Sequence, residues 1–190
     1  MICSISDHII VVDDTSDFAD VLAERLRIAG FENITVYNDP REALKAIRGN
    51  TRPAIVITDF NMPNLTGVKL LDEIEQHHPE IDGVVITGDI SAAMEHPHRY
   101  LIFDKSTNTF YQKLIVHTLG IIRFHIRPLI DACPAGTEKP DCPFKGIRTF
   151  SVRKKMEWIE ALQPADIRPL VRHHQACINN PADPDCSKTN

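Results

Sequence analysis

The sequence predicts an α/β fold, a doubly wound parallel sheet of five strands followed by a small helical carboxyl-terminal extension. Between residues 8 and 119, short apolar runs alternate with amphipathic helical patterns, and this order gives a parallel sheet with right-handed crossovers. Near residue 120 the net charge changes from −8 to +3, and four of the five cysteines follow that point. A chain of 190 residues, 43% hydrophobic and 25% charged, has room for one ordinary domain and an appendage.

The strand candidates are short and rich in Val and Ile. Their apolar character is nearly continuous, as expected of parallel strands that are buried on both faces. The five candidates are residues 8–13, 34–37, 54–58, 83–87 and 99–103.

Helical patterns separate these strands. Ser16 can cap a first helix that ends at Gly30, and Asp39 with Pro40 opens a second helix with proline in its first turn. A third pattern contains Val68, Leu70, Leu71 and Ile74 and ends before Pro79. Residues 91–95 leave room for only a stunted fourth helix, whereas the last helix is expected to be long, from about residue 109 to 130.

The remaining residues predict a helical hairpin between two cysteine-bounded loops. Residues 133–142 and 177–186 have equal length and both end in Pro-Asp-Cys, a weak internal repeat. Helices are expected to start near Ser151 and Pro164, and Pro169 should kink the second helix or shift its start. We therefore divide the chain into residues 1–131 and residues 132–190.

Polar side chains stand at the ends of four of the apolar runs. The acid pair Asp13 and Asp14 follows the first run, Asp59 the third, Thr87 the fourth and Lys105 the fifth. Ligands of open α/β sheets bind beyond the carboxyl ends of the strands, so these groups can converge on one crevice. Each residue alone is more often a loop, cap or solvated strand end; their combination and order favour a site.

Together with Asp59-x-x-Met62-Pro63 and Thr87-Gly88, this pattern resembles the receiver domain of bacterial two-component response regulators, over roughly residues 7–119. The resemblance implies the flavodoxin-like fold and a phosphoprotein in which Asp59 takes a phosphoryl group from a sensor histidine kinase or a phosphotransfer protein. It also implies Mg²⁺, an ion that prefers oxygen ligands. The implied ligands are Asp59, Asp14 directly, Asp13 through water and the backbone carbonyl of Asn61. Thr87 and Lys105 would each contact a phosphoryl oxygen.

Two positions depart from the family pattern. The family usually follows its lysine with proline, often through a cis bond, but Ser106 follows Lys105 here. A cis bond before a non-proline residue costs about 3 kcal/mol, so this loop either holds a strained bond or runs differently. Ile102 stands where the family commonly has an aromatic residue that moves inward when the threonine engages phosphate. The output surface is therefore expected to be atypical.

The tail cysteines leave three interpretations open. Cys133, Cys142, Cys177 and Cys186, with His174, contain enough soft ligands for Zn²⁺, but loops of eight residues between the cysteines are longer than zinc sites favour. Disulfides Cys133–Cys142 and Cys177–Cys186, or cross-pairs, are the second interpretation, and in a reducing compartment they would be redox-responsive. The third is four thiols without a shared site.

We interpret the chain as a response regulator of a two-component phosphorelay, a switch and not an enzyme with an external substrate. Phosphorylation would change the output through the extension, with a downstream protein partner. One alternative is a receiver-like interaction module that is never phosphorylated and senses redox state or metal through the tail. A DNA-binding transcriptional regulator is another, but +3 over about seventy residues is a weak basic signal.

The sequence also indicates where the protein works. Asp7 and His8 interrupt any amino-terminal signal, and the apolar stretch 114–130 carries two His and two Arg residues. We therefore expect a cytoplasmic protein without a membrane partner. The long last helix makes a homodimer plausible.

Overall fold

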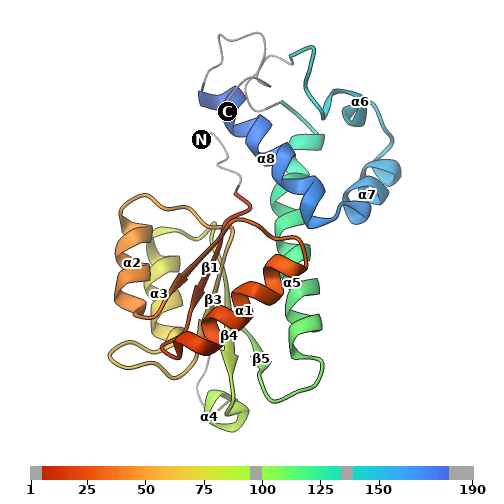
Figure 1. The fold of residues 1–190 in the computed structure, drawn as a ribbon. Coiled ribbons are helices and arrows are strands. Elements are labelled where there is room, and N and C mark those ends of the chain that lie inside the picture. The colour runs from red at the N-terminus through yellow and green to blue at the C-terminus, as the bar shows by residue number, and fades with distance from the viewer. Residues whose placement is uncertain (1–5, 95–99, 134–138, 180–190) are drawn as a thin grey trace. The chain divides into compact units, whose positions relative to one another are not determined.

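In the computed structural model, residues 6–94, 100–133 and 139–179 are described (Figure 1). They fall into two compact units: residues 8–121, and residues 122–179 with the segment before residue 8. The two units divide between Ile121 and Ile122, inside a helix, and this division does not test where a functional domain ends. The predicted boundary at residue 131 therefore stays a prediction. Among the described residues, no helix is long and apolar enough to cross a membrane.

The first unit is built on a five-stranded parallel sheet, which confirms the predicted fold class. The strand order is β2-β1-β3-β4-β5, with the change of direction at β1, so the sheet is doubly wound. The strands are β1 Ile9–Val12, β2 Ile34–Tyr37, β3 Ile55–Asp59, β4 Asp82–Thr87 and β5 Leu101–Asp104. Ile9 of β1 pairs with Ile34 of β2 on one side and with Ile55 of β3 on the other.

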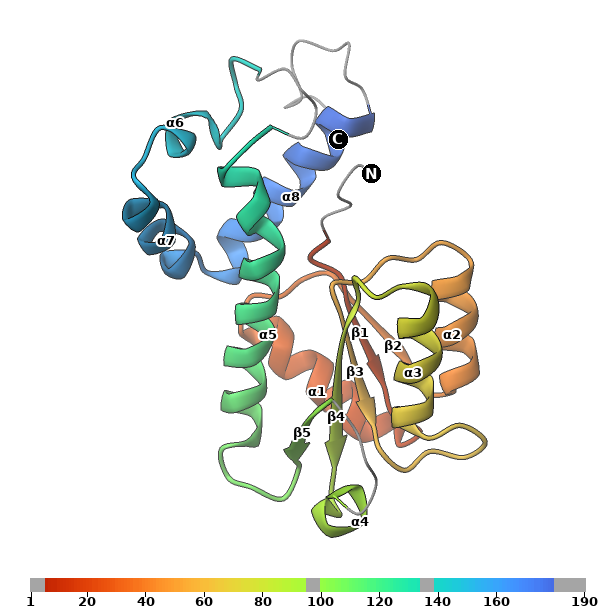
Figure 2. The same cartoon turned by 180° about the vertical axis from the view of Figure 1, so that it is seen from behind.

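Helices cover both faces of this sheet, as the two views show (Figures 1 and 2). The first unit contains α1 Ser16–Ile28, α2 Pro40–Arg48, α3 Gly67–His77, α4 Ile90–Met94 and most of α5 Phe110–Ile126. Helices α2 and α3 lie together on one face, and α1 and α5 are on the other. Because side chains of a strand alternate between faces, Ile10 and Val12 of β1 join the core under α2 and α3.

The helix ends follow the local chemistry with one exception. The Asp39 carboxylate accepts a hydrogen bond from the Arg41 backbone N–H at the start of α2, as predicted. Ser16 is not the cap of α1: Thr15 holds that position without a side-chain hydrogen bond, and Ser16 is the first helical residue. Gly30 ends the α1 region with a φ of 97°, a conformation that glycine adopts at little cost.

The second unit is helical. After α5 come a 3₁₀ turn η1 Arg127–Ile130, and the helices α6 Lys145–Arg148, α7 Val152–Ala161 and α8 Pro164–Asn179. The expected helix to residue 130 thus ends as an α-helix at Ile126 and tightens into a 3₁₀ turn. Helix α8 starts at Pro164, as expected, and Pro169 lies inside it, so Pro169 does not shift the start of the helix. The alternative, a kink at Pro169, stays a prediction. The turn α6 was not predicted.

Polar contacts organise this second unit around backbone carbonyls. The Arg123 guanidinium donates to the carbonyl oxygen of Leu162, at the end of α7, at 2.9 and 2.5 Å. The Arg148 guanidinium donates to the carbonyl of Leu129 at 3.1 Å. The ring of Phe144 packs edge-on against Trp158, with centroids 6.3 Å apart. Small helical units have few apolar residues to bury, so such contacts to helix ends matter more here.

Candidate functional site

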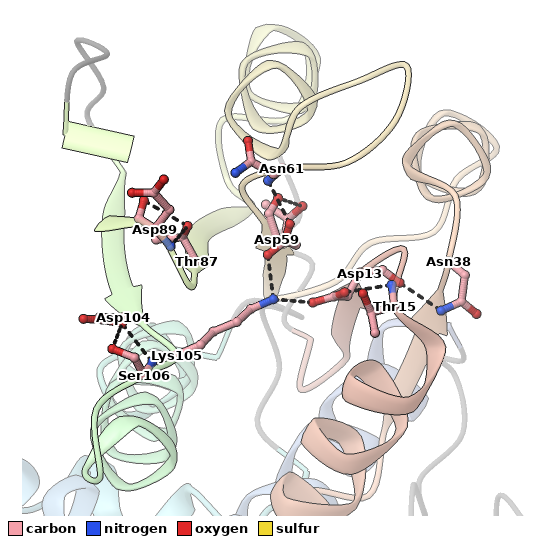
Figure 3. A network of polar contacts seen from close by, with 11 residues as sticks. Asp13, Thr15, Asn38, Asp59, Asn61, Thr87, Asp89, Asp104, Lys105 and Ser106 are labelled. Carbon is pink, nitrogen blue, oxygen red and sulfur yellow. Dashed lines mark hydrogen bonds and ion pairs between the residues drawn. The ribbon is translucent and has the colours of Figure 1, made fainter. Parts of the chain in front are cut away.

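Four of the polar residues at strand ends lie along the carboxyl edge of the sheet, and three of them are in contact. Asp13 follows β1, Asp59 ends β3, Thr87 ends β4 and Lys105 follows β5 (Figure 3). Their strands are neighbours in the parallel sheet, so their ends open on the same side. The structure therefore brings together residues that are up to 92 positions apart in the chain.

Lys105 joins the two buried carboxylates. Its Nζ lies 2.6 Å from Asp13 Oδ2 and 2.6 Å from Asp59 Oδ1 (Figure 3). Asp13 is 1% exposed and Asp59 is 8% exposed, while the Lys105 side chain keeps 17% of its surface open. Two carboxylates this deep require a cation between them, because unpaired buried charge is strongly unfavourable.

Backbone N–H groups orient both carboxylates. The Asn61 N–H donates to Asp59 Oδ2 at 2.8 Å, and the Thr15 N–H donates to Asp13 Oδ1 at 2.9 Å. The Asn38 side-chain amide holds the loop after β1 by donating to the Asp13 carbonyl at 2.9 Å. Each carboxylate thus uses one oxygen for a backbone donor and presents the other to Lys105.

Burial raises the pKa of the Asp59 carboxyl above its usual value. The ammonium of Lys105, by hydrogen bond and by charge, and the Asn61 N–H lower it, while the Asp13 carboxylate raises it further. The raised value shows that desolvation outweighs Lys105. A further cation at this position would favour the ionised carboxylate.

Gly67, at the start of α3, approaches the backbone of Asp59. A Cβ at this position would lie 2.1 Å from the carbonyl oxygen of Asp59 and 2.9 Å from Thr58 Cγ2. The Gly67 N–H donates to the Phe60 carbonyl at 3.1 Å. Only glycine allows α3 to start this close to the end of β3, so Gly67 fixes where Asp59 stands.

Thr87 is buried, and its hydroxyl is engaged by the backbone of Asp89. The Thr87 Oγ1 accepts from the Asp89 N–H at 3.0 Å and donates to the Asp89 carbonyl at 3.2 Å. The Asp89 carboxylate in turn accepts from the Ala92 N–H at 3.0 Å at the start of α4. In Figure 3 this pair stands beside the Asp59 and Lys105 group, not within it.

The loop after Lys105 runs without a cis bond, since the described residues contain none. Asp104 Oδ1 instead accepts from both the Ser106 N–H, at 2.8 Å, and the Ser106 hydroxyl, at 2.6 Å. The Lys105 N–H donates to the Thr87 carbonyl at 2.7 Å. These hydrogen bonds fix the turn that a proline ring fixes in the family pattern. Of the two possibilities for the Lys105–Ser106 loop, it is thus the second, a different course of the loop, that the structure shows.

The donor set suits a hard cation, although no three His, Cys, Asp or Glu side chains of the described residues gather as metal ligands. Asp13 and Asp59 converge on a cationic group, the Lys105 ammonium, which stands where positive charge is needed. Carboxylate and carbonyl oxygens are the ligands that Mg²⁺ prefers. Asp14 is exposed, and the Asn61 backbone lies beside Asp59, so both stay candidates for the ligand set.

The tail cysteines do not assemble into a zinc site within the described part of the chain. Cys142 is not in a disulfide, so the Cys133–Cys142 pairing, one form of the second interpretation, is absent. Cys177 is disulfide-bonded, and Cys186 lies outside the described residues. His174 is buried in the second unit.

Three residues that shape the site were missed in the sequence. Phe18 looked like one more apolar residue of the first helix, but its ring faces the Lys105 ammonium at 4.1 Å. Gly67 carried a signal, since a glycine directly before an apolar helical stripe suggests a close backbone approach. Asp104 gave none, because an acid before a strand-end lysine is usually solvated.

Comparisons with known proteins agree on one family for the first unit. Residues 9–102 match the family model of the response regulator receiver domain. The chain is 35% identical over 86 residues to the DNA-binding transcriptional regulator NtrC of Escherichia coli (strain K12), a match that covers 44% of this chain and 18% of NtrC. It is 35% identical over 82 residues to the transcriptional regulatory protein PrrA of Mycobacterium tuberculosis, covering 43% of this chain and 34% of PrrA.

Solved structures give the same result. A response regulator receiver domain protein from Clostridium thermocellum is 27% identical and superposes with a TM-score of 0.50 over 62% of this chain and 94% of that chain. The signal receiver domain of an HD domain-containing protein from Pseudomonas fluorescens Pf-5 shares the fold, with a TM-score of 0.54 at 21% identity, over 63% of this chain and 97% of that chain. The match covers 18% of the length of NtrC and 34% of the length of PrrA, so the chain spans about a third or less of these two curated relatives.

Proposed function

Because residues 9–102 of this chain are a receiver domain of the response regulator family, we propose that the protein is a phosphorylation switch with Asp59 as the phosphoacceptor. The partner is a phosphohistidine on a sensor histidine kinase or phosphotransfer protein, met in the cytoplasm. The observation that carries this proposal is the Asp59 carboxylate, oriented by the Asn61 N–H and held 2.6 Å from the Lys105 ammonium.

The reaction moves one phosphoryl group between two atoms. An Asp59 carboxylate oxygen attacks phosphorus, the P–N bond of the phosphohistidine breaks, and its electron pair stays on the imidazole nitrogen, which then takes up a proton. Such a transfer needs positioning and positive charge near the equatorial oxygens more than it needs acid or base chemistry. Lys105 supplies one such charge from the end of β5, and Thr87 has to turn its hydroxyl from Asp89 to contact a phosphoryl oxygen.

Mg²⁺ held by the carboxylates of Asp59 and Asp14, by Asp13 through water and by the carbonyl of Asn61 would neutralise the charge that develops on the phosphoryl oxygens. The chain itself prepares for this in two ways. It buries two carboxylates whose mutual repulsion a cation relieves, and it keeps them pointed at one position through the N–H groups of Thr15 and Asn61. The mixed ligand set of acids and a carbonyl fits an oxygen-seeking ion.

The output is proposed to pass through the helical extension to a downstream protein. Helix α5 belongs to the receiver unit up to Ile121 and to the helical unit from Ile122. NtrC is named as a DNA-binding transcriptional regulator, but the match covers only 44% of this chain and 18% of NtrC. DNA binding by residues 132–190 therefore remains the alternative, and salt-dependent binding that disappears when these residues are removed would favour it.

Acetyl phosphate tests the switch directly. The full chain is incubated with this donor, with and without Mg²⁺, and its intact mass is read for wild type, Asp59→Asn and Asp20→Asn, in which an exposed carboxylate of α1 is replaced. We expect a Mg²⁺-dependent phosphoryl adduct in wild type and in Asp20→Asn and none in Asp59→Asn. A folded wild-type protein without an adduct would contradict the proposal and favour an unphosphorylated interaction module.

A further inference from the structure

The Lys105 ammonium has a third neighbour besides the two carboxylates. The ring of Phe18, on α1, has its centroid 4.1 Å from Lys105 Nζ. An ammonium group has three N–H bonds, of which two are used by Asp13 and Asp59. The face of an aromatic ring carries negative charge density and attracts a cation, most strongly where water is excluded. Phe18 thus gives the rest of this cation a favourable neighbour.

Phe18 is itself fixed in place. Its ring lies 6.2 Å from that of Phe110, the first residue of α5, and Phe110 is fully buried. Phe110 also packs edge-on against Tyr111, with centroids 4.9 Å apart. A ring held by such neighbours offers its face to the ammonium at little cost in lost side-chain freedom.

The two kinds of contact differ in what they demand. Hydrogen bonds to the carboxylates are directional, and a divalent cation competes with the ammonium for the same oxygens. The contact with the ring face tolerates small sideways shifts of the ammonium. A divalent ion that prefers oxygen ligands does not compete for the ring. When the carboxylates change partner, the ring is the contact that the ammonium keeps.

We propose that Phe18 is a positioning residue that holds the Lys105 ammonium at the site while Mg²⁺ takes over the carboxylates of Asp13 and Asp59. The inference rests on the proposed function, because it assumes that a cation binds there. In this arrangement Lys105 stays beside the position where the phosphoryl oxygen arrives, and it does not swing into solvent. Phe18 acts through Lys105 and does not touch the reacting atoms.

The test observes the lysine ammonium itself. The full chain is labelled with ¹⁵N at lysine, and slowly exchanging ammonium signals are recorded at low temperature with and without Mg²⁺. The signal of Lys105 is assigned by its loss in Lys105→Met. The variants are Phe18→Leu, which keeps an apolar side chain without a ring, and Phe18→Tyr, which restores the ring.

We expect wild type and Phe18→Tyr to show a protected Lys105 signal that shifts with Mg²⁺ but persists. Phe18→Leu should show the signal without Mg²⁺, when both carboxylates hold the ammonium, which also proves that this variant is folded. It should lose the signal when Mg²⁺ is added. Loss in wild type with Mg²⁺, retention in Phe18→Leu with Mg²⁺, or loss in Phe18→Tyr would each overturn the inference.

Failure of the proposed function looks different. If Mg²⁺ moves no signal in wild type, the magnesium site is contradicted, and the role of Phe18 is contradicted with it. If wild type shows no protected Lys105 signal even without Mg²⁺, the enclosed ammonium on which the inference stands is refuted.

Phosphorylation rates give a second readout. At saturating Mg²⁺, Phe18→Leu should form the acetyl phosphate adduct about two- to thirty-fold more slowly, the range that corresponds to known cation–π strengths. Phe31→Leu, which also removes a buried ring of the first unit, should leave the rate unchanged. An equal loss in both variants would assign the effect to general packing and overturn the role of Phe18.

Discussion

Replacing Gly67 by alanine should disturb the phosphoacceptor without touching its side chain. The new Cβ would lie 2.1 Å from the Asp59 carbonyl oxygen, whereas ordinary contact begins at 3.4 Å. The start of α3 and the end of β3 must therefore separate by roughly 1 Å. Overpacking of this kind costs about 1–3 kcal/mol of unfolding free energy. The better helix propensity of alanine offsets up to about 1 kcal/mol.

The larger effect should appear in phosphoryl transfer. A misplacement of about 1 Å at a reacting group can reduce a rate on the order of 100-fold. The assay measures the rate of adduct formation with acetyl phosphate and Mg²⁺ by intact mass, and the unfolding of the receiver unit in urea by circular dichroism. The fluorescence of Trp158, the chain's single tryptophan, follows the helical unit separately.

Gly120→Ala is the matched control. A Cβ at Gly120, in α5, would have no heavy atom within 4 Å, so this variant should keep the wild-type rate and gain a little stability. If Gly67→Ala reacts at the wild-type rate with wild-type stability, the proposed positioning of Asp59 by α3 is refuted. If both variants lose rate equally, the close approach of Gly67 is not the cause.

Three further outcomes are expected. Because burial raises the pKa of Asp59, the folded state holds this proton more firmly than the unfolded chain does. The protonated Asp59 carboxyl therefore stabilises the fold fully below its ordinary pKa of 3.8, and this stabilisation is lost as the pH rises through the raised pKa. Without Mg²⁺, the urea unfolding free energy of wild type should fall over that interval relative to that of Asp59→Asn. A constant difference between the two proteins would contradict the burial argument. Asp104→Ala removes the acceptor of two Ser106 hydrogen bonds, so adduct formation should slow several-fold, with less loss in Ser106→Ala because the backbone bond survives; unchanged rates in both would show that the turn does not position Lys105. Arg123→Met leaves the Leu162 carbonyl without its two donors, which should cost about 1–3 kcal/mol and lower the urea midpoint of Trp158 fluorescence.

The fold could be predicted because its central strands, β1 and β3, are buried along their whole length. Continuous Val and Ile runs such as residues 9–12 have few other uses in a soluble chain, and the alternation with helical patterns then fixes a parallel sheet. The last strand was misplaced by one or two residues, in a segment where Tyr100 is only partly buried and Leu101 is exposed. The turn α6, Lys145–Arg148, has no apolar period from which it could be predicted.

The sequence allowed a prediction of which residues lie at the site but not of which side chains contact one another there. Residue type and strand order placed Asp13, Asp59 and Lys105 at one edge. The bridging of both acids by one ammonium, however, depends on how far the lysine side chain reaches from β5 past β4 to the ends of β3 and β1. The engagement of Thr87 by Asp89 depends on a loop conformation that residue types do not specify. The roles of Asp13, Asp14, Asp59, Asn61, Thr87 and Lys105 in phosphorylation stay predictions that the adduct experiment tests.

The position of α5 determines where a protease can cleave the chain and where a truncated version of it can end. The two units change over between Ile121 and Ile122, inside a helix and not in a loop. A protease needs an extended segment of backbone, and the residues at this junction are held in helical conformation by their hydrogen bonds. Limited digestion should therefore not release the receiver unit at residue 121. A shortened gene that encodes the receiver alone should end beyond Ile126, because a stop at the junction would leave the last turns of α5 without the residues that complete their hydrogen bonds.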